Sequence, residues 1–118
     1  MRCRILLIPL LGTALGCGDS LAPNAEPVLL LEGDTSFALV NTTSGYEIGY
    51  AALTTRQAPL VLLAACRNWP RIAPRGNAIV RHTEVLGYQG PGTDSATVHW
   101  CRLEGDTELE AGTLETPL

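Results

Sequence analysis

The sequence has no lysine, no long uninterrupted apolar run and no stretch with the periodicity of an amphipathic helix. Its eight basic residues are all arginine, and with twelve acidic residues they give a formal net charge of −4. This balance argues against nucleic-acid binding, which needs a basic footprint. No apolar run approaches the roughly 20 residues of a membrane-spanning helix. Without helical periodicity, β-strands are the expected elements.

The N-terminus carries an export signal. Arg2 and Arg4 precede an apolar run from Ile5 to Leu11, and small residues then lead to Cys17. A positive start, a short apolar core and a small-residue exit are typical of a secretory signal peptide. As a helix, the segment from Ile5 to Gly16 would be roughly 18 Å long, well short of the roughly 30 Å hydrocarbon core.

The end of this signal, Ala14-Leu15-Gly16-Cys17, resembles the lipobox of bacterial lipoproteins. In that family the peptidase cuts before the cysteine, which then carries diacylglycerol and usually an N-acyl chain. The resemblance implies a signal peptide at 1–16, lipidation of Cys17 and a membrane partner in the cell envelope. Gly18 after the cysteine favours the outer membrane by the sorting rule of enteric lipoproteins. The alternative is an ordinary cleaved signal that leaves Cys17 as a thiol.

The remaining chain of about 100 residues is enough for one small domain. Loss of Arg2 and Arg4 with the signal would change its formal charge to −6. The stretch GDSLAPNAEP is polar and has no periodicity, so we expect a lipidated tether over 17–27 and a domain over 28–118. A flexible coil of this length spans roughly 15–20 Å, which keeps the domain close to the membrane.

The domain has the pattern of an all-β protein. We expect about seven short strands, over 28–32, 36–41, 46–51, 71–73, 78–86, 96–103 and 108–114. The segment 36–41 is apolar on both faces, which indicates a central strand. The apolar run 60–66 fits a buried strand or two helical turns, and we favour a strand, or a strand with a short helical turn. The count and the turn spacing predict an antiparallel β-sandwich of the immunoglobulin-like kind, with a small open barrel as the alternative.

The resemblance to immunoglobulin domains is architectural. Trp69 lies only three residues after Cys66, and His99 stands where a tyrosine corner would lie. In layout the chain is similar to small bacterial lipoproteins that carry one such domain of uncharacterised function. Because Cys3 leaves with the signal and Cys17 takes lipid, Cys66 and Cys101 have one possible disulfide pairing in an oxidising compartment.

Charged residues are segregated along the chain. Several arginines follow one another with no acidic residue between Glu47 and Glu84, and five carboxylates crowd the segment after residue 103. Four of these arginines form a possible anion-binding face for phosphorylated lipid or acidic glycan: Arg67, Arg71, Arg75 and Arg81. The alternative is that the two groups of charges neutralise each other or are simply solvated.

No catalytic residue, metal site or cofactor is predicted. Gly18-Asp19-Ser20-Leu21 spells the nucleophile block of the GDSL esterases, but no Asp is followed three places on by His, and the block lies in the tether. His82 and His99 do not form close ligand pairs with the cysteines, as structural zinc sites require. We therefore expect a non-enzymatic binding or structural role, with an envelope protein or glycan as the possible partner. Anion recognition is the alternative, and a small hydrolase is less favoured.

Two structural observations would separate these classes. A histidine beside a carboxylate in a pocket would favour an enzyme. An exposed apolar or arginine-rich patch near the glycine-rich loop at 87–95 would favour a binding module. A purely structural protein predicts neither.

Overall fold

The computed structural model describes residues 26–92 and 94–118. The predicted signal peptide, the lipidation of Cys17, the Gly18–Leu21 block and the tether up to residue 25 lie outside the described residues. Within the described part, helical structure is limited to three 3-10 turns: η1 (Ala58–Leu60), η2 (Cys66–Asn68) and η3 (His82–Glu84). No helix in these residues is long and apolar enough to cross a membrane.

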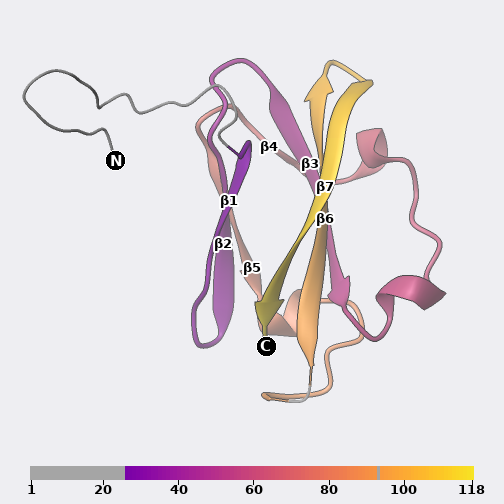
Figure 1. The fold of residues 1–118 in the computed structure, drawn as a ribbon. Helices are drawn as coiled ribbons and strands as arrows, with labels where there is room; N and C mark the ends of the chain where they lie inside the picture. Colours follow the sequence, from indigo (N-terminus) through magenta and orange to yellow (C-terminus); the bar gives the residue numbers. More distant parts are fainter. Residues whose placement is uncertain (1–25, 93) are drawn as a thin grey trace, which may run out of the picture.

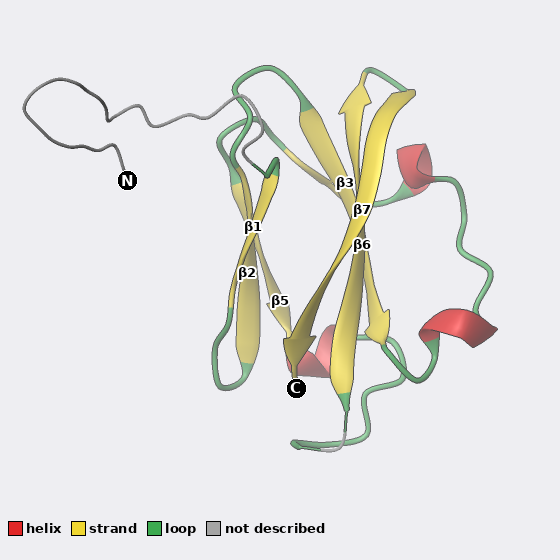
Figure 2. Ribbon diagram, in the orientation of Figure 1, coloured by secondary structure: helices red, strands yellow, loops and turns green. Residues whose placement is uncertain are grey.

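Two antiparallel sheets pack face to face (Figures 1 and 2). Sheet A contains β1 (Val28–Leu31), β2 (Ser36–Asn41) and β5 (Asn77–Arg81), in the order β1-β2-β5. Sheet B contains β3 (Glu47–Thr54), β4 (Arg71–Ile72), β6 (Ser95–Glu104) and β7 (Thr107–Pro117), in the order β4-β3-β6-β7. The chain passes between the sheets after β2, β4 and β5. The predicted seven-stranded, immunoglobulin-like sandwich is confirmed.

The core forms where alternate residues of the two sheets face each other. Phe37 and Leu39 of β2 are at most 1% exposed, and Val98 and Trp100 of β6 pack into the same cluster. The register places Gly112 of β7 opposite Trp100, where a Cβ would come within 2.7 Å of the indole. The period-two burial of apolar side chains is what the sequence pattern predicts for a sandwich.

The strand predicted at 60–66 is wrong. Residues 61–65 have no strand partner and link η1 to η2. The neighbouring edge of β3 is already occupied, because β4 pairs with Ile48 and Gly49, and Leu86 bridges to Leu53. An apolar run becomes a strand only where another strand offers it backbone partners.

The strand predicted at 78–86 is shorter than expected. It ends at Arg81, and the chain turns through η3, because the Glu84 carboxylate accepts a hydrogen bond from the Arg81 backbone N–H (3.0 Å). At the other end of the domain, the Thr42 N–H donates to the Pro27 carbonyl and its hydroxyl donates to the Glu26 carbonyl. Within the described residues, the hydrogen bonds of the sandwich therefore include the two residues before Val28.

Candidate binding surfaces

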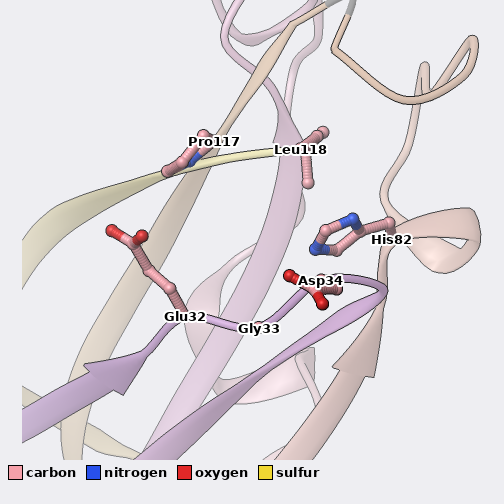
Figure 3. Close-up of a pocket in the computed structure, with 6 residues that line it drawn as sticks. All are labelled: Glu32, Gly33, Asp34, His82, Pro117 and Leu118. Atoms are coloured by element: carbon pink, nitrogen blue, oxygen red, sulfur yellow. The ribbon is translucent and has the colours of Figure 1, made fainter.

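A pocket of about 390 Å³ lies at one end of the sandwich (Figure 3). Its lining residues are Glu32, Gly33, Asp34, His82, Pro117 and Leu118. His82 is only 5% exposed, and its Nε2 atom has no hydrogen-bond partner among the described residues. In Figure 3 its imidazole points toward the Asp34 carboxylate, but no hydrogen bond or ion pair joins the two.

This pocket places a histidine beside a carboxylate, the arrangement that would favour an enzyme, but it offers no side-chain nucleophile for covalent catalysis. It offers two carboxylates, and no serine, threonine or cysteine lines it. A nucleophile within hydrogen-bond reach of a base is the signature of covalent catalysis. His99 lies elsewhere, on sheet B, with its ring 6.5 Å from that of Trp69. In the described residues no group of three His, Cys, Asp or Glu side chains could hold a metal ion.

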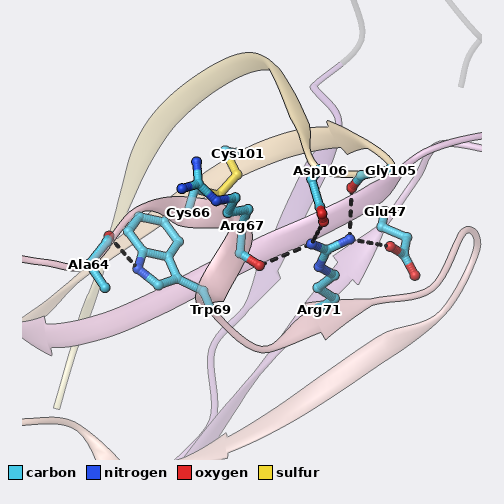
Figure 4. The surroundings of a disulfide bond; sticks show 9 residues. All are labelled: Glu47, Ala64, Cys66, Arg67, Trp69, Arg71, Cys101, Gly105 and Asp106. Atoms are coloured by element: carbon cyan, nitrogen blue, oxygen red, sulfur yellow. Dashed lines mark hydrogen bonds and ion pairs between the residues drawn. A yellow bond between two sulfur atoms is a disulfide. The ribbon is translucent and has the colours of Figure 1, made fainter.

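A disulfide joins Cys66 of η2 to Cys101 of β6, as the sequence predicts (Figure 4). These sulfurs cluster with Leu103 and Trp69, apart from the main core. The bond therefore lies on the outer face of sheet B, whereas the immunoglobulin disulfide links the two sheets through the core. A Cβ at Gly49 would come within 2.8 Å of the Cys66 Sγ, so the disulfide packs directly against the backbone of β3.

Arg71 forms hydrogen bonds with several separate parts of the chain at this end of sheet B (Figure 4). Its Nη1 atom donates to Glu47 Oε1 (2.9 Å) and to the Gly105 carbonyl (2.8 Å). Its Nη2 atom donates to Asp106 Oδ1 (2.7 Å) and to the Arg67 carbonyl (2.9 Å). Hydrogen bonds to the carboxylates of Glu47 and Asp106 raise the pKa of Arg71 above its ordinary value. Four of the five guanidinium N–H groups are thus used within the protein.

The other three arginines of the predicted anion-binding face differ in their surroundings. Arg81 pairs with Glu84 (3.1 Å) on sheet A. Arg67 and Arg75 are exposed, and their side chains make no ion pair among the described residues. The structure therefore places Arg67 beside Arg71 and puts Arg81 on the other sheet. Anion binding by these residues stays a prediction.

The most exposed apolar side chains belong to residues 60–65, which we call the apolar segment. Leu60 is 76% exposed and Leu62 is 98% exposed, while Val61 and Leu63 are half-buried. The backbone is extended at Val61, and residues 61–63 make no hydrogen bond with other described residues. In Figure 1 the segment lies beyond sheet B, on the side away from sheet A. The apolar run is visible in the sequence, but its composition predicts a buried element, whereas the structure exposes Leu60 and Leu62.

Both ends of the apolar segment are fixed. The Leu60 N–H donates to the Gln57 carbonyl (2.8 Å), and the Trp69 indole N–H donates to the Ala64 carbonyl (2.9 Å). The disulfide at Cys66 holds the following turn on β6. Because the ends are held, the exposed side chains project from a supported stretch of extended chain.

A second apolar surface is the outer face of sheet A. Here the register aligns Leu29 with Val40, and Leu31 with Ala38, while Ala38 also lies opposite Ile79. Leu29 and Leu31 are about half exposed and Ile79 is 61% exposed. Sequence reasoning finds the apolar character of this face, since 36–41 is apolar on both sides, but it predicts burial where the structure shows exposure.

No family model, curated protein or solved structure matches this chain. Any functional inference therefore depends on the surfaces of the domain. Among the described residues, the apolar segment and the outer face of sheet A each expose several large apolar side chains together.

Proposed function

We propose that this protein is a lipid-anchored envelope protein whose β-sandwich is a binding module and not an enzyme. The observation that carries the proposal is the apolar segment, with Leu62 98% exposed on a supported stretch of chain. The anchor is the lipidated Cys17 that the resemblance to the lipobox implies.

The apolar segment has the properties of a recognition element. Contiguous exposed apolar surface on a small domain marks an interaction site more often than an isolated apolar residue does. Its backbone is extended at Val61, and its N–H and C=O groups at 61–63 are without partners among the described residues, so a protein partner can add a strand to it. Fixed ends reduce the conformational entropy that binding would remove.

The position of the segment also fits this proposal. The turn η1 begins beside the glycine-rich loop, where a Cβ on Gly87 would come within 2.5 Å of the Gln57 side chain. An exposed apolar patch near that loop is the feature that distinguishes a binding module from a purely structural protein. We infer that the partner is an envelope protein that offers a strand edge.

Two alternatives receive less support. Recognition of an anionic glycan or lipid would depend on Arg67 and Arg75, because Arg71 already makes four hydrogen bonds and Arg81 pairs with Glu84. A hydrolase would have to use water as the nucleophile at the His82 pocket, because no serine, threonine or cysteine lines it, and His82 makes no hydrogen bond to Asp34 that would orient it as a base.

The anchor is tested by the intact mass of protein extracted from membranes. We expect cleavage before Cys17, a mass increase for two or three acyl chains, and a further gain of two hydrogens on reduction of the disulfide. A mature chain of unmodified mass, released into the soluble fraction, would contradict the anchor.

The binding role is tested with a photo-crosslinking amino acid placed at Leu62 in cells. We expect one discrete adduct to an envelope protein. The matched control is the same substitution at Leu109, a leucine of β7 that is 43% exposed but lies outside the segment. Identical adduct patterns at both positions, or none at Leu62, would refute a recognition role for the apolar segment.

A further inference from the structure

We propose that the outer face of sheet A lies against the surface of the membrane that holds the anchor. This inference rests on the proposed lipid anchor at Cys17. It assigns the domain an orientation: sheet A toward the bilayer, and sheet B with the apolar segment away from it.

The face has the composition of a membrane-contacting surface. Two rows of side chains cross its three strands, the first with Leu29, Val40 and Asn77, the second with Leu31, Ala38 and Ile79. Five of these six side chains are apolar, and the three largest are each about half exposed or more. An apolar surface with a polar rim can settle into the headgroup boundary of a bilayer.

The described chain begins at the edge of this sheet. Residue 26 is the first described, and two residues later the chain enters β1, the edge strand that contributes Leu29 and Leu31. Glu26 is the ninth residue after Cys17, so even a fully extended tether reaches only about 30 Å. An anchor this close to β1 holds sheet A near the bilayer at a high effective concentration.

The distribution of charge agrees with this orientation. No carboxylate projects from the three strands of this face, and its one charged residue, Arg81, is paired with Glu84 of η3. Glu32 and Asp34 lie in the loop beyond the end of β1, not on the face. The carboxylates of β7 belong to sheet B: Glu108, Glu110 and Glu115. Anionic headgroups attract basic segments and repel carboxylates, so they favour contact through sheet A.

A second copy of the chain fits this face less well. Neighbouring strands lie about 4.8 Å apart and alternate residues about 6.8 Å apart, so the face measures roughly 14 by 14 Å, or about 200 Å². A stable protein interface buries about 800 Å² on each partner. A face of this size is too small to hold a second copy by itself. It can still add to membrane association, because the proposed anchor already holds the domain at the membrane surface.

The experiment uses the acylated protein reconstituted into phosphatidylcholine vesicles. A nitroxide label is attached at Asn77→Cys, on the outer face of sheet A, or at Thr113→Cys, exposed on sheet B. Collisions of each label with oxygen, which concentrates in the bilayer, and with a water-soluble nickel chelate are measured. Flotation of the vesicles reports anchoring separately.

We expect the ratio of oxygen to nickel-chelate accessibility to be several-fold higher at Asn77→Cys than at Thr113→Cys. Adding Leu31→Ser and Ile79→Ser should lower the ratio at the first site to that of the second, while the protein still floats.

Equal, water-like ratios at both sites in floating protein would overturn the inference and leave the anchor intact. Protection of the first site from both reagents would also overturn it, because a second protein copy would then cover the face. Loss of flotation would overturn the anchor itself, and the inference with it.

Discussion

The two outer faces of this sandwich differ in what covers them. On sheet B, residues 58–70 fold back over the strands, and we call them the cover. The cover is held by the Cys66–Cys101 disulfide, the Trp69 indole and the Arg71 guanidinium. On sheet A nothing in the described residues covers the outward side chains of β1, β2 and β5, and Leu29, Leu31 and Ile79 stay exposed. The central strand β2 is apolar on both sides, yet only its inward side chains, Phe37 and Leu39 among them, are fully buried. The pattern of a strand therefore shows that both faces can be buried and not that both are.

The largest expected effect comes from removing the bond that holds the cover. In the variant with Cys66→Ala and Cys101→Ala we expect the free energy of unfolding to fall by about 3.5–4 kcal/mol, because the bond closes a loop of 35 residues. Denaturant titration measures the loss. Hydrogen exchange should accelerate in residues 58–70 more than in β2. A uniform acceleration would show that the disulfide supports the whole domain and not the cover.

The close packing of Cys66 against the backbone of β3 is tested by Gly49→Ala. The added methyl would lie 2.8 Å from the Cys66 Sγ and 3.0 Å from the Cys66 carbonyl oxygen, so we expect a loss of about 1–3 kcal/mol. Gly45→Ala is the control, since a Cβ there meets nothing within 4 Å. In the variant without the disulfide the effect of Gly49→Ala should shrink. An equal effect in both backgrounds would contradict direct packing of the disulfide on β3.

Removing the guanidinium in Arg71→Met should have a smaller effect than either change at the disulfide. It breaks contacts to Glu47 and Asp106, both of which are partly in water. We expect a lower melting temperature, and a difference from the native protein that narrows at high salt. Arg75→Met, at an exposed arginine without an ion pair, serves as the control. Equal effects of the two substitutions would show that Arg71 does not fasten the cover.

The smallest effect is expected on sheet A, at the ion pair that ends β5. Hydrogen bonds from the Arg81 backbone N–H and guanidinium hold the pKa of Glu84 below its ordinary value of 4.5. Because the folded pKa is lowered, the contribution of Glu84 to stability is complete above about pH 5 and is lost as the pH falls through the lowered pKa.

Glu84→Gln should therefore be slightly less stable than the native protein at neutral pH and equal to it in acid. Parallel thermal melts from pH 7 to pH 2 measure the difference, with Glu108→Gln as the control. A difference that persists at the acid end would assign the effect to the shape of η3 and not to charge.

Local pattern was sufficient to predict most of the fold. Alternation in 36–41 and 96–103, and glycine-rich turns between strands, predict β2, β6 and their connections, and elimination predicts the disulfide. The apolar run at 60–66 could not be assigned from the sequence, because its fate depends on whether the edge of β3 is free. That edge is taken by β4 and Leu86, which are distant in the chain.

The candidate surfaces were harder to predict than the fold. Sequence identifies which residues are apolar or charged but not which of them find partners. Arg71 and Arg75 are equivalent in the sequence, yet one makes four hydrogen bonds and the other makes no ion pair. The same limit applies to Leu62 and Leu63, neighbours of which one is fully exposed and the other half-buried.

The edge strand β7 has a consequence for behaviour at high local density. It is eleven residues long and leaves one side of its backbone open, which is the geometry by which strands of separate molecules fuse into aggregates. Glu108, Glu110 and Glu115 lie along it, and of these Glu110 pairs with Arg102, so the edge keeps a net negative charge that disfavours pairing with a second copy. If the proposed anchor confines many copies to one lipid surface, they would repel one another along the edge most prone to uncontrolled association.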